Sequence, residues 1–498
     1  MGFYRLEYYY ISKLQSSALK CLKEKNMVAE TVLTHLMRRR AGSILTFPAN
    51  SQAPRLEPPA PQAGKTYLLY LHIPFCEQLC PYCSFNRTLL DRPLAEDYFQ
   101  ALEQEMRIYH DRGYLFDSIY VGGGTPTILP DSLSSLLRLA GKLWRIGQIS
   151  AETNPNHLTP DTLGLLKDLG VNRLSVGVQS FQDPILQAIG RYRHYGSGRQ
   201  TRQRLEAALG RFDTLNVDMI FNFPMQDEQL LTRDLQVLKN LEVDQVTFYP
   251  LMAGRKVREE LAKLGRIRFS REKRLYNRIW NELTADYHPS SAWCFSRKAT
   301  AKGLSGTHPT DESLIDEYIV ANEEYAGLGS GSFGYLRGTI YANTFSIPCY
   351  IEALGKGRLP VLAERRFSRA EQLRYDFLMK MFGGSLDLGH LDKKYSACAE
   401  RELWKELLFF RMNGAAYRGP GSPRLLTLSR KGYYFLVILM REFFTGVNNF
   451  REACLAADAT EVGGSAVEGA GGAGAGKTGI QTTPAVNPDG ERNLVPPV

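Results

Sequence analysis

Hydrophobic positions follow two different periods through the middle of this chain. Short apolar runs rich in β-branched residues recur between residues 67 and 249, and stretches with apolar residues every three or four positions separate them. This pattern predicts six strands, at Tyr67–Ile73, Ser118–Val121, Gln148–Glu152, Arg173–Val178, Val217–Phe221 and Gln245–Tyr249. It predicts helices between them, near Leu94–Asp111, Asp131–Trp144, Pro160–Leu169, Arg199–Arg211 and Glu228–Leu241.

The regular alternation of strands and helices predicts an α/β fold with a parallel sheet. Successive right-handed crossovers would curl such a sheet into a partial (β/α)6 barrel, and an open doubly wound sheet is the alternative. The barrel is favoured because nearly every predicted strand ends in polar or Gly-rich residues, such as Gly122–Pro126 and Glu152–Pro155. In a barrel, the carboxyl ends of the strands meet on the face where active sites lie.

The segments outside the predicted barrel, which covers residues 65–290, differ in composition. Residues 1–64 read as an N-terminal extension with a Pro-rich linker, in which Met27 is a plausible second start. Residues 291–359 form a Gly-rich segment after the barrel. Residues 360–455 predict a mainly helical, winged-helix-like domain with a short β-ribbon at Leu425–Ser429. The Gly/Ala-rich residues 456–498 predict a disordered tail, because they cannot bury enough apolar surface to order.

Three cysteines stand close together just after the first predicted strand. Cys76, Cys80 and Cys83 are separated by three and then two residues, a spacing that suits an iron–sulfur cluster better than a disulfide. Three thiolates leave one iron of a cubane [4Fe–4S] cluster without a protein ligand. A zinc site is the alternative, but no fourth Cys or His lies nearby to complete a tetrahedron. The remaining cysteines read as ordinary thiols: Cys21, Cys294, Cys349, Cys398 and Cys454.

Composition limits the possible partners and compartment of the chain. Unevenly spaced cysteines in 498 residues do not form a disulfide framework, so we expect a cytoplasmic, reducing environment. We expect no integral membrane segment, because no apolar run is long enough to span a bilayer. Residues 1–64 carry about half of the net charge of +9, and no basic stripe interleaved with aromatic residues follows. We therefore expect no nucleic-acid partner.

Four segments together resemble a known family. Tyr70–Cys83 contains CxxxCx(aromatic)C with Tyr82 as the aromatic residue, and Gly122–Pro126 reads GGGTP. With Arg173–Phe181 and Asp218–Pro224, these motifs resemble the oxygen-independent coproporphyrinogen III oxidase family of radical S-adenosylmethionine (SAM) proteins. That family includes oxidases (HemN type), haem chaperones (HemW type) and haem-processing enzymes (HutW type).

The resemblance implies a cofactor set and the residues that hold it. Cys76, Cys80 and Cys83 would bind a [4Fe–4S] cluster whose open iron is chelated by SAM. An electron from the reduced cluster would then split SAM into a 5′-deoxyadenosyl radical. No catalytic residue is expected beyond the ligands of these cofactors. The cofactor-binding residues implied by the resemblance are Tyr70, Tyr82, Gly123, Gly124, Thr125, Glu152, Gln179, Arg191 and Asp218.

The resemblance also implies a role in tetrapyrrole metabolism. The expected activity is that of a coproporphyrinogen III oxidase-like oxidoreductase, with a low-potential electron donor as partner and haem as a further candidate ligand. A HemW-type haem chaperone is the alternative, because the true oxidases carry another cysteine two residues beyond the third ligand, where this chain has Phe85. A winged-helix regulator with a redox-sensing cluster is a third hypothesis.

Overall fold

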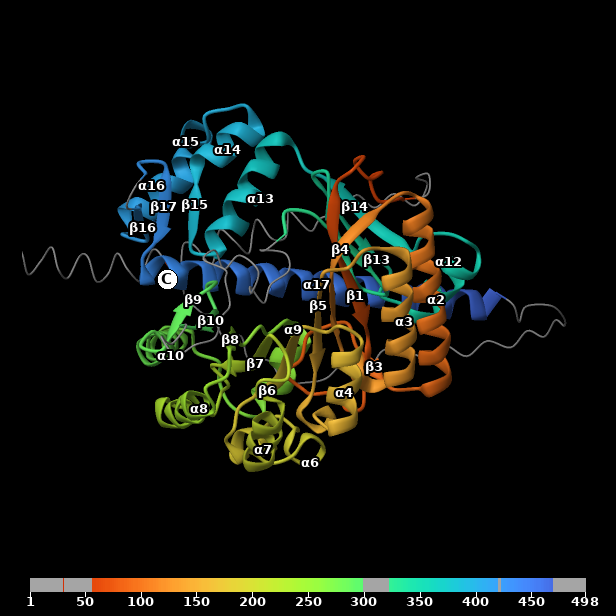
Figure 1. Cartoon of the computed structure of the whole chain (residues 1–498), viewed down its shortest axis with the longest axis horizontal. Coiled ribbons are helices and arrows are strands. Elements are labelled where there is room, and N and C mark those ends of the chain that lie inside the picture. The colour runs from red at the N-terminus through yellow and green to blue at the C-terminus, as the bar shows by residue number, and fades with distance from the viewer. Residues whose placement is uncertain (1–29, 31–55, 299–321, 420–421, 469–498) are drawn as a thin grey trace, which may run out of the picture. The chain divides into compact units, whose positions relative to one another are not determined.

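The computed structural model describes residues 30, 56–298, 322–419 and 422–468 (Figure 1). The chain divides into two compact units, Met1–Leu455 and Ala456–Val498. The plausible second start at Met27 lies outside the described residues. The predicted disordered tail begins where the second unit begins, but helix α17 (Arg430–Glu468) continues to Glu468, so this part of the tail is helical. The boundaries predicted at residues 65, 291 and 360 stay predictions.

Six parallel strands form the centre of the first unit, and all six were predicted. They are β1 (Thr66–Ile73), β4 (Leu115–Gly123), β5 (Gln148–Thr153), β6 (Arg173–Gln179), β7 (Thr214–Phe221) and β8 (Gln245–Pro250). They lie side by side in sequence order, and each pair of neighbours is parallel. A doubly wound sheet would reverse its direction of growth, so this order confirms the partial barrel.

Helices follow the strands and cover the outer face of the sheet (Figure 1). They are α2 (Arg92–Asp111), α3 (Pro130–Leu143), α4 (Pro160–Asp168), α7 (Gly198–Ala208) and α8 (Glu228–Leu241). Local sequence sets their starts: Asp91 accepts a hydrogen bond from the backbone of Leu94 at 3.1 Å, and Ser197 with Gln200 forms a capping box. Two short helices that the sequence did not predict, α5 (Asp183–Ala188) and α6 (Tyr192–Tyr195), separate β6 from α7.

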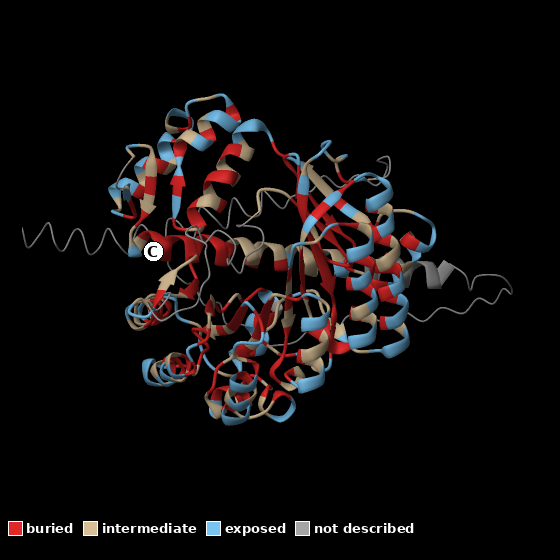
Figure 2. Ribbon diagram, viewed as in Figure 1, coloured by how far each residue is buried: buried red, intermediate tan, exposed pale blue. Residues whose placement is uncertain are grey.

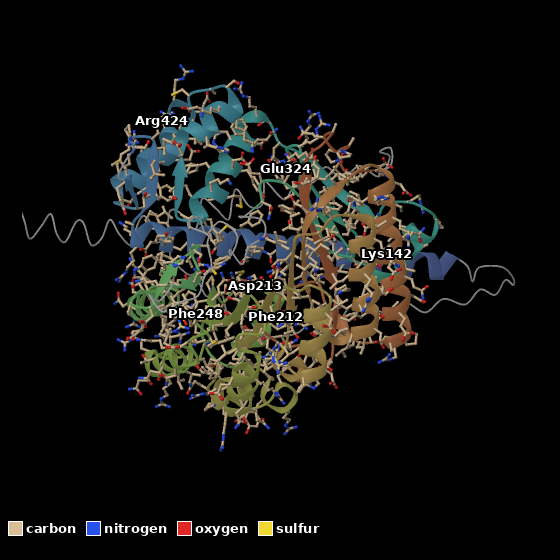
Figure 3. The ribbon with its side chains drawn as sticks, viewed as in Figure 1. Lys142, Phe212, Asp213, Phe248, Glu324 and Arg424 are labelled. Atoms are coloured by element: carbon tan, nitrogen blue, oxygen red, sulfur yellow. The ribbon has the colours of Figure 1, made fainter. Side chains whose placement is uncertain are left out.

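Apolar residues collect between these layers. Buried residues run along the strands and the inner sides of the helices, while exposed residues lie on the outer sides (Figure 2). Phe248 of β8 lies in the interior and is fully buried, whereas Lys142 at the end of α3 is exposed (Figure 3). Burial of this apolar surface, rather than helix propensity, stabilises the barrel.

The sheet extends beyond the six central strands on both sides. β11 (Tyr325–Leu328) pairs in parallel with β1, and β12 (Phe333–Leu336), β13 (Thr339–Asn343) and β14 (Val361–Arg366) continue it antiparallel. On the other side, β10 (Cys294–Arg297) and β9 (Tyr287–Pro289) follow β8. The segment after the barrel therefore belongs to the same twelve-stranded sheet.

The C-terminal region is mainly helical, as predicted. Its helices before α17 are α13 (Arg369–Phe382), α14 (Leu388–Tyr395), α15 (Ala399–Glu402) and α16 (Trp404–Met412). The predicted ribbon is strand β17 (Leu425–Leu428), which pairs with β15 (Ser385–Asp387) and β16 (Ala416–Arg418). Among the described residues, no helix combines the length and the apolar character that crossing a membrane requires.

A buried carboxyl group, Glu105 of α2, connects the barrel to the extension of the sheet. Its oxygens accept hydrogen bonds from the backbone of Gly329 at 2.8 Å, from Asn343 at 3.0 Å and from the Tyr350 hydroxyl at 2.6 Å. Tyr350 lies on α12 (Ile347–Gly355). Burial raises the pKa of Glu105 from 4.5 to about 7, because the charged form loses its hydration.

We expect Glu105→Gln to change how stability depends on pH. Because the folded chain binds the Glu105 proton more tightly than the unfolded chain, the contribution of this group is fully present below pH 4.5 and is lost as the pH rises through about 7. Between these limits the wild type should lose about 3 kcal/mol of unfolding free energy relative to the variant. Denaturant unfolding of both proteins at a series of pH values measures this, and parallel profiles would contradict it.

Candidate functional site

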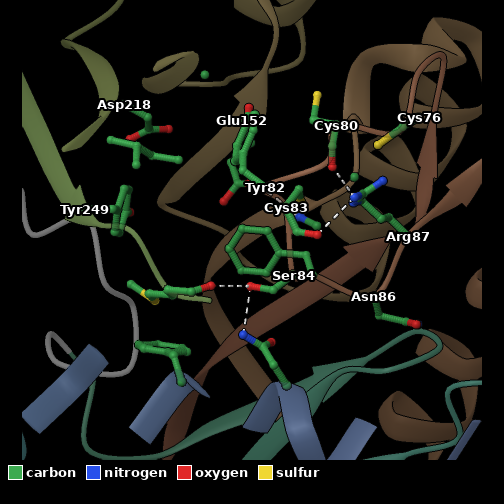
Figure 4. Close-up of a pocket in the computed structure, with 18 of the residues that line it drawn as sticks. Cys76, Cys80, Tyr82, Cys83, Ser84, Asn86, Arg87, Glu152, Asp218 and Tyr249 are labelled. Carbon is green, nitrogen blue, oxygen red and sulfur yellow. Dashed lines mark hydrogen bonds between the residues drawn. The ribbon is translucent and has the colours of Figure 1, made fainter. Parts of the chain in front are cut away.

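The carboxyl ends of the six central strands open into one cavity of about 310 Å³ (Figure 4). Each strand contributes at least one side chain or glycine to its wall. These residues are Tyr70 and His72 of β1, Gly123 of β4, Glu152 of β5, Gln179 of β6, Asp218 of β7 and Tyr249 of β8. The cavity therefore lies where a parallel barrel places its active site.

The three cysteines lie on one loop at this cavity. Cys76 is in the short strand β2 (Phe75–Cys76), and Cys80 and Cys83 follow on the loop; all three line the cavity and none forms a disulfide. Arg87 fixes the turn by donating hydrogen bonds to the backbone oxygens of Cys80 at 2.5 Å and Cys83 at 2.9 Å (Figure 4). The loop is thus held in shape by groups other than the thiols.

The chemistry of these thiols fits a cluster. Burial raises the pKa of the Cys76 thiol to about 12, so it becomes a thiolate only beside a strong positive charge such as that of an iron ion. In the described part of the chain, no three His, Cys, Asp or Glu side chains converge to hold a single metal ion. In a cubane each cysteine binds a different iron, so its three thiols need not converge on one point.

The Gly-rich turn packs directly against the cysteine loop. The backbone nitrogen of Gly124 donates to the Ile73 oxygen at 2.7 Å, and that of Thr125 donates to the Phe75 oxygen at 2.8 Å. A methyl group on Gly124 would lie 2.5 Å from the Phe75 oxygen and 3.0 Å from the Cys76 sulfur. The absence of a side chain here is what allows the turn and the loop to meet.

Hydrogen bonds connect this turn to Arg191. The Thr125 hydroxyl points to the Cys76 sulfur at 3.8 Å, Asn154 donates to that hydroxyl at 2.8 Å, and Arg191 donates to Asn154 at 2.9 Å. Arg191 also donates to the Tyr82 hydroxyl at 3.2 Å. The sequence analysis did not single out Asn154 by itself. Its position directly after β5, in the polar segment Glu152–Pro155, was the available signal.

Arg191 itself is fully enclosed. Its guanidinium stacks on the Tyr195 ring at 3.9 Å and lies 3.8 Å from the Cys80 sulfur. Burial lowers the pKa of Arg191, but Tyr82, Cys80 and Tyr195 together raise it by more, so the net shift is upward and the guanidinium stays charged. Arg191 therefore places a fixed positive charge behind Cys80 and Tyr82.

The acidic and amide residues at the strand ends are held in position by neighbours. Glu152 accepts hydrogen bonds from the Tyr120 hydroxyl at 2.8 Å and from the backbone of Gly123 at 3.0 Å. Asp218 accepts from the Ser175 hydroxyl at 2.6 Å and from Asn216 at 2.8 Å.

Gln179 has a positive φ of 72°. Such backbone strain in a non-glycine residue is concentrated at functional sites.

Tyr70 and His72 of β1 form a pair beside the loop. Burial lowers the pKa of His72 to about 4, so its ring is neutral near pH 7. Its Nε2 lies 2.9 Å from the backbone oxygen of Asn86, which can only accept, so Nε2 carries the proton. Its Nδ1 then accepts from the Tyr70 hydroxyl at 2.8 Å. Tyr70 thus faces the cavity while its hydroxyl donates its hydrogen bond to His72.

The structure brings all twelve residues implied by the family resemblance to this one region, and eleven of them line the cavity. Thr125 is the exception: it is buried behind the wall, against Cys76. The sequence missed the contribution of α17, whose Asn448 and Arg451 also line the cavity. No local signal could reveal it, because these residues are distant in sequence from every motif.

Comparison with known proteins identifies the class to which the fold and site belong. Residues 70–247 match the radical SAM superfamily, so this part of the chain is a radical SAM domain. Within that class it is related to proteins named as haem chaperones and as oxygen-independent coproporphyrinogen III oxidases, as the motifs predicted.

Two relatives illustrate this relationship. Heme chaperone HemW of Bacillus subtilis is 29% identical over 321 residues, covering 62% of this chain and 82% of that protein. Oxygen-independent coproporphyrinogen III oxidase of Pseudomonas aeruginosa is 32% identical over 199 residues, covering 38% of this chain and 43% of that protein.

A solved structure supports the fold. Coproporphyrinogen III oxidase (HemN) from Escherichia coli superposes with a TM-score of 0.62 and 19% identity, covering 76% of this chain and 90% of that one. Because the sequence identity is only 19%, this match supports the fold and not the function. The fold that it supports is the partial barrel with its C-terminal region.

We expect Gly124→Ala to reduce cluster binding. The added methyl group would push the turn away from Phe75 and Cys76, which moves one of the three thiols. Iron and sulfide per chain after anaerobic reconstitution should fall several-fold. Gly141→Ala is the matched control, because a methyl group there would have no atom within 4 Å apart from its chain neighbours and its own helix backbone. We expect this change to stabilise α3 by about 1 kcal/mol. Equal iron content in the two variants would contradict this expectation.

Proposed function

We propose that this protein binds a [4Fe–4S] cluster through Cys76, Cys80 and Cys83, cleaves SAM, and acts on a tetrapyrrole as a coproporphyrinogen III oxidase-like enzyme. The observation that carries this proposal is the convergence of the cysteine loop and the polar ends of all six strands on one cavity. The radical SAM class implies the cluster and SAM, and the names of the relatives support the tetrapyrrole. A reducing, cytoplasmic location and a low-potential electron donor are parts of the same proposal.

Different residues of the cavity wall would bind different parts of the cofactors. When bound, the cluster and SAM supply an electron and a carbon-centred radical. Glu152 and Asp218, each oriented by a hydroxyl donor, can accept hydrogen bonds from an ammonium group or from ribose hydroxyls. The Gly123–Thr125 turn lets a ligand approach the backbone closely, and Gln179 offers an amide beside it.

Arg191 and Tyr82 would stabilise the cysteine loop as well as contact the ligand. Both are buried and hydrogen-bonded to each other, so their first effect is to fix Cys80 and the loop around it. A fixed positive charge also favours thiolates and a carboxylate nearby. Tyr70 is fixed by His72 and would limit the space beside the cluster.

The side of the cavity beyond the cysteine loop suits a large flat ligand. Aromatic residues form much of it: Phe85, Tyr249, Trp293, Phe333, Phe345 and Phe444. Aromatic faces stack on planar rings and keep water away from reactive intermediates. A tetrapyrrole has the matching shape and apolar character.

A haem chaperone of the HemW type is the second candidate. Ser84-Phe85 follows the third cysteine, so the further cysteine of the true oxidases is absent from that position. Three of the relatives that match well over most of their own length carry the chaperone name, from Bacillus subtilis, Lactococcus lactis and Mycobacterium tuberculosis. In this version the same cavity would hold haem for transfer.

We expect the cluster cysteines to be required for SAM cleavage. Replacing Cys76, Cys80 and Cys83 by alanine together should abolish the visible absorbance of the reconstituted protein and lower 5′-deoxyadenosine formation to background. Replacing the exposed Cys349 and Cys398 is the control and should change neither. Cleavage that survives loss of the three thiols would overturn the proposal.

The same assay separates the two candidates. The enzyme version predicts that 5′-deoxyadenosine formation rises when coproporphyrinogen III is added and that a decarboxylated product accumulates. The chaperone version predicts stoichiometric haem binding and transfer to an apoprotein, with no such product.

A further inference from the structure

Helix α17 contributes a complete face to the wall of the cavity. Phe444, Val447, Asn448 and Arg451 all line it. Their spacing of three, four and seven residues places them on one side of the helix. None of the sequence motifs includes a residue of this face. The roles proposed above also leave its charged residue, Arg451, without a function.

The position of this face is fixed from two directions. Asn448 donates a hydrogen bond to the Ser84 hydroxyl at 2.7 Å, directly after the last cysteine of the loop (Figure 4). The Phe450 ring packs against Phe345 and Phe333, with centroids 5.9 and 6.4 Å apart. The helix is therefore anchored to the cysteine loop and to the extension of the sheet, which gives Arg451 a defined place.

Arg451 brings a positive charge that its neighbours only partly balance. Its side chain is 12% exposed, and one nitrogen donates to the backbone oxygen of Ser84. Among the described residues, the one carboxylate within ion-pair range is that of Glu452 at 4.0 Å, and this oxygen has no hydrogen-bond partner. Burial lowers the pKa of Arg451 and the like charge of Arg87 adds to this effect, while Cys83 and Glu452 offset it only in part. A buried guanidinium in this state favours a further anion.

The surroundings of Arg451 define the kind of anion. The cavity wall is mostly apolar and aromatic, and the exposed Phe85 ring lies on the same loop as Ser84. A small hydrated anion gains little from such a wall, whereas a planar apolar ring gains a large contact area. The ligand that satisfies both features is a flat ring with carboxylates on its edge.

We propose that Arg451 of α17 binds a peripheral carboxylate of the ring-shaped ligand and thereby selects ligands with free acid side chains. This inference rests on the proposed tetrapyrrole function and adds to it a specificity-determining residue. The guanidinium would keep its bond to Ser84 while its outer nitrogens bind the carboxylate. The ligand edge would then be held between α17 and the cysteine loop.

A different role for Arg451 would give different results. If it served only to hold the Ser84 backbone, its loss would disturb the loop and the cluster whatever the ligand. If it only balanced the charge of Cys83, its loss would change iron content or the reduction potential of the cluster. A carboxylate partner instead predicts an effect that depends on the ligand having a free acid.

The test uses the full chain, reconstituted anaerobically, and two probes: iron protoporphyrin IX and its dimethyl ester in the same detergent buffer. The proteins are wild type, Arg451→Gln, Arg451→Lys and Arg202→Gln. Arg202 is the matched control, an exposed arginine of α7 paired with Glu206 at 2.9 Å. Binding is followed by visible absorbance, and iron content and 5′-deoxyadenosine formation without added tetrapyrrole are measured for each protein.

We expect Arg451→Gln to weaken binding of the free acid by about 10- to 100-fold and to leave binding of the ester unchanged. Arg451→Lys should fall between the wild type and this variant, because it keeps the charge and loses the two-pronged geometry. Arg202→Gln should match the wild type, and iron content should be equal in all four proteins.

Three results would overturn this assignment. Arg451→Gln could bind both probes as the wild type does, it could lose both equally, or the wild type could fail to distinguish the free acid from the ester. A wild type with a full cluster that binds neither probe would instead overturn the tetrapyrrole part of the proposed function, and this inference with it.

Discussion

The close packing of the Gly123–Gly124 turn against the cysteine loop is the contact on which the rest of the site depends. It joins the end of β4 to the loop that leaves β1, and it leaves no room for a side chain at Gly124. Because of this contact, Cys76 lies beside Thr125, and Thr125 leads through Asn154 to Arg191. Three strand ends and the loop thereby form one rigid unit around the place where a cluster would bind.

This rigidity explains how an open site can be kept on the loops of a barrel. Loops usually move more than the strands that they connect. Here Arg87 fixes the turn through backbone oxygens, and His72 fixes the far end of the loop at Asn86. These contacts position the three thiols without any bond between the thiols themselves. Each thiol can therefore bind a different iron. The remaining side of the cavity is left to aromatic residues and to α17, where a substrate would lie.

The sequence predicted much of the fold because its signals are local. Each central strand is a short apolar run and each covering helix repeats its apolar residues every three or four positions. The six central strands β1, β4, β5, β6, β7 and β8 were therefore predicted to within a few residues of their ends. The extension of the sheet was harder to predict from the sequence, because β11 to β14 are short and β11 pairs with β1, which is distant in sequence. The small helices α5 and α6 carry too few turns to show a period. The end of α17 was read as tail, because Gly and Ala gave no apolar face.

The site was predictable where one segment supplies several groups, and not where distant segments meet. The cysteines, the glycines and the strand ends each carry a pattern that names its chemistry. Asn448 and Arg451 carry none, since their role arises only when α17 lies against the loop at Ser84.

The central claim is that the three thiols hold a cubane whose fourth iron is free for SAM, and Mössbauer spectroscopy of the iron-57 protein tests it most directly. The account predicts a four-iron cluster in which one iron changes its spectrum when SAM is added, while the other three do not. A spectrum that SAM leaves unchanged, or one without a four-iron cluster, would contradict it.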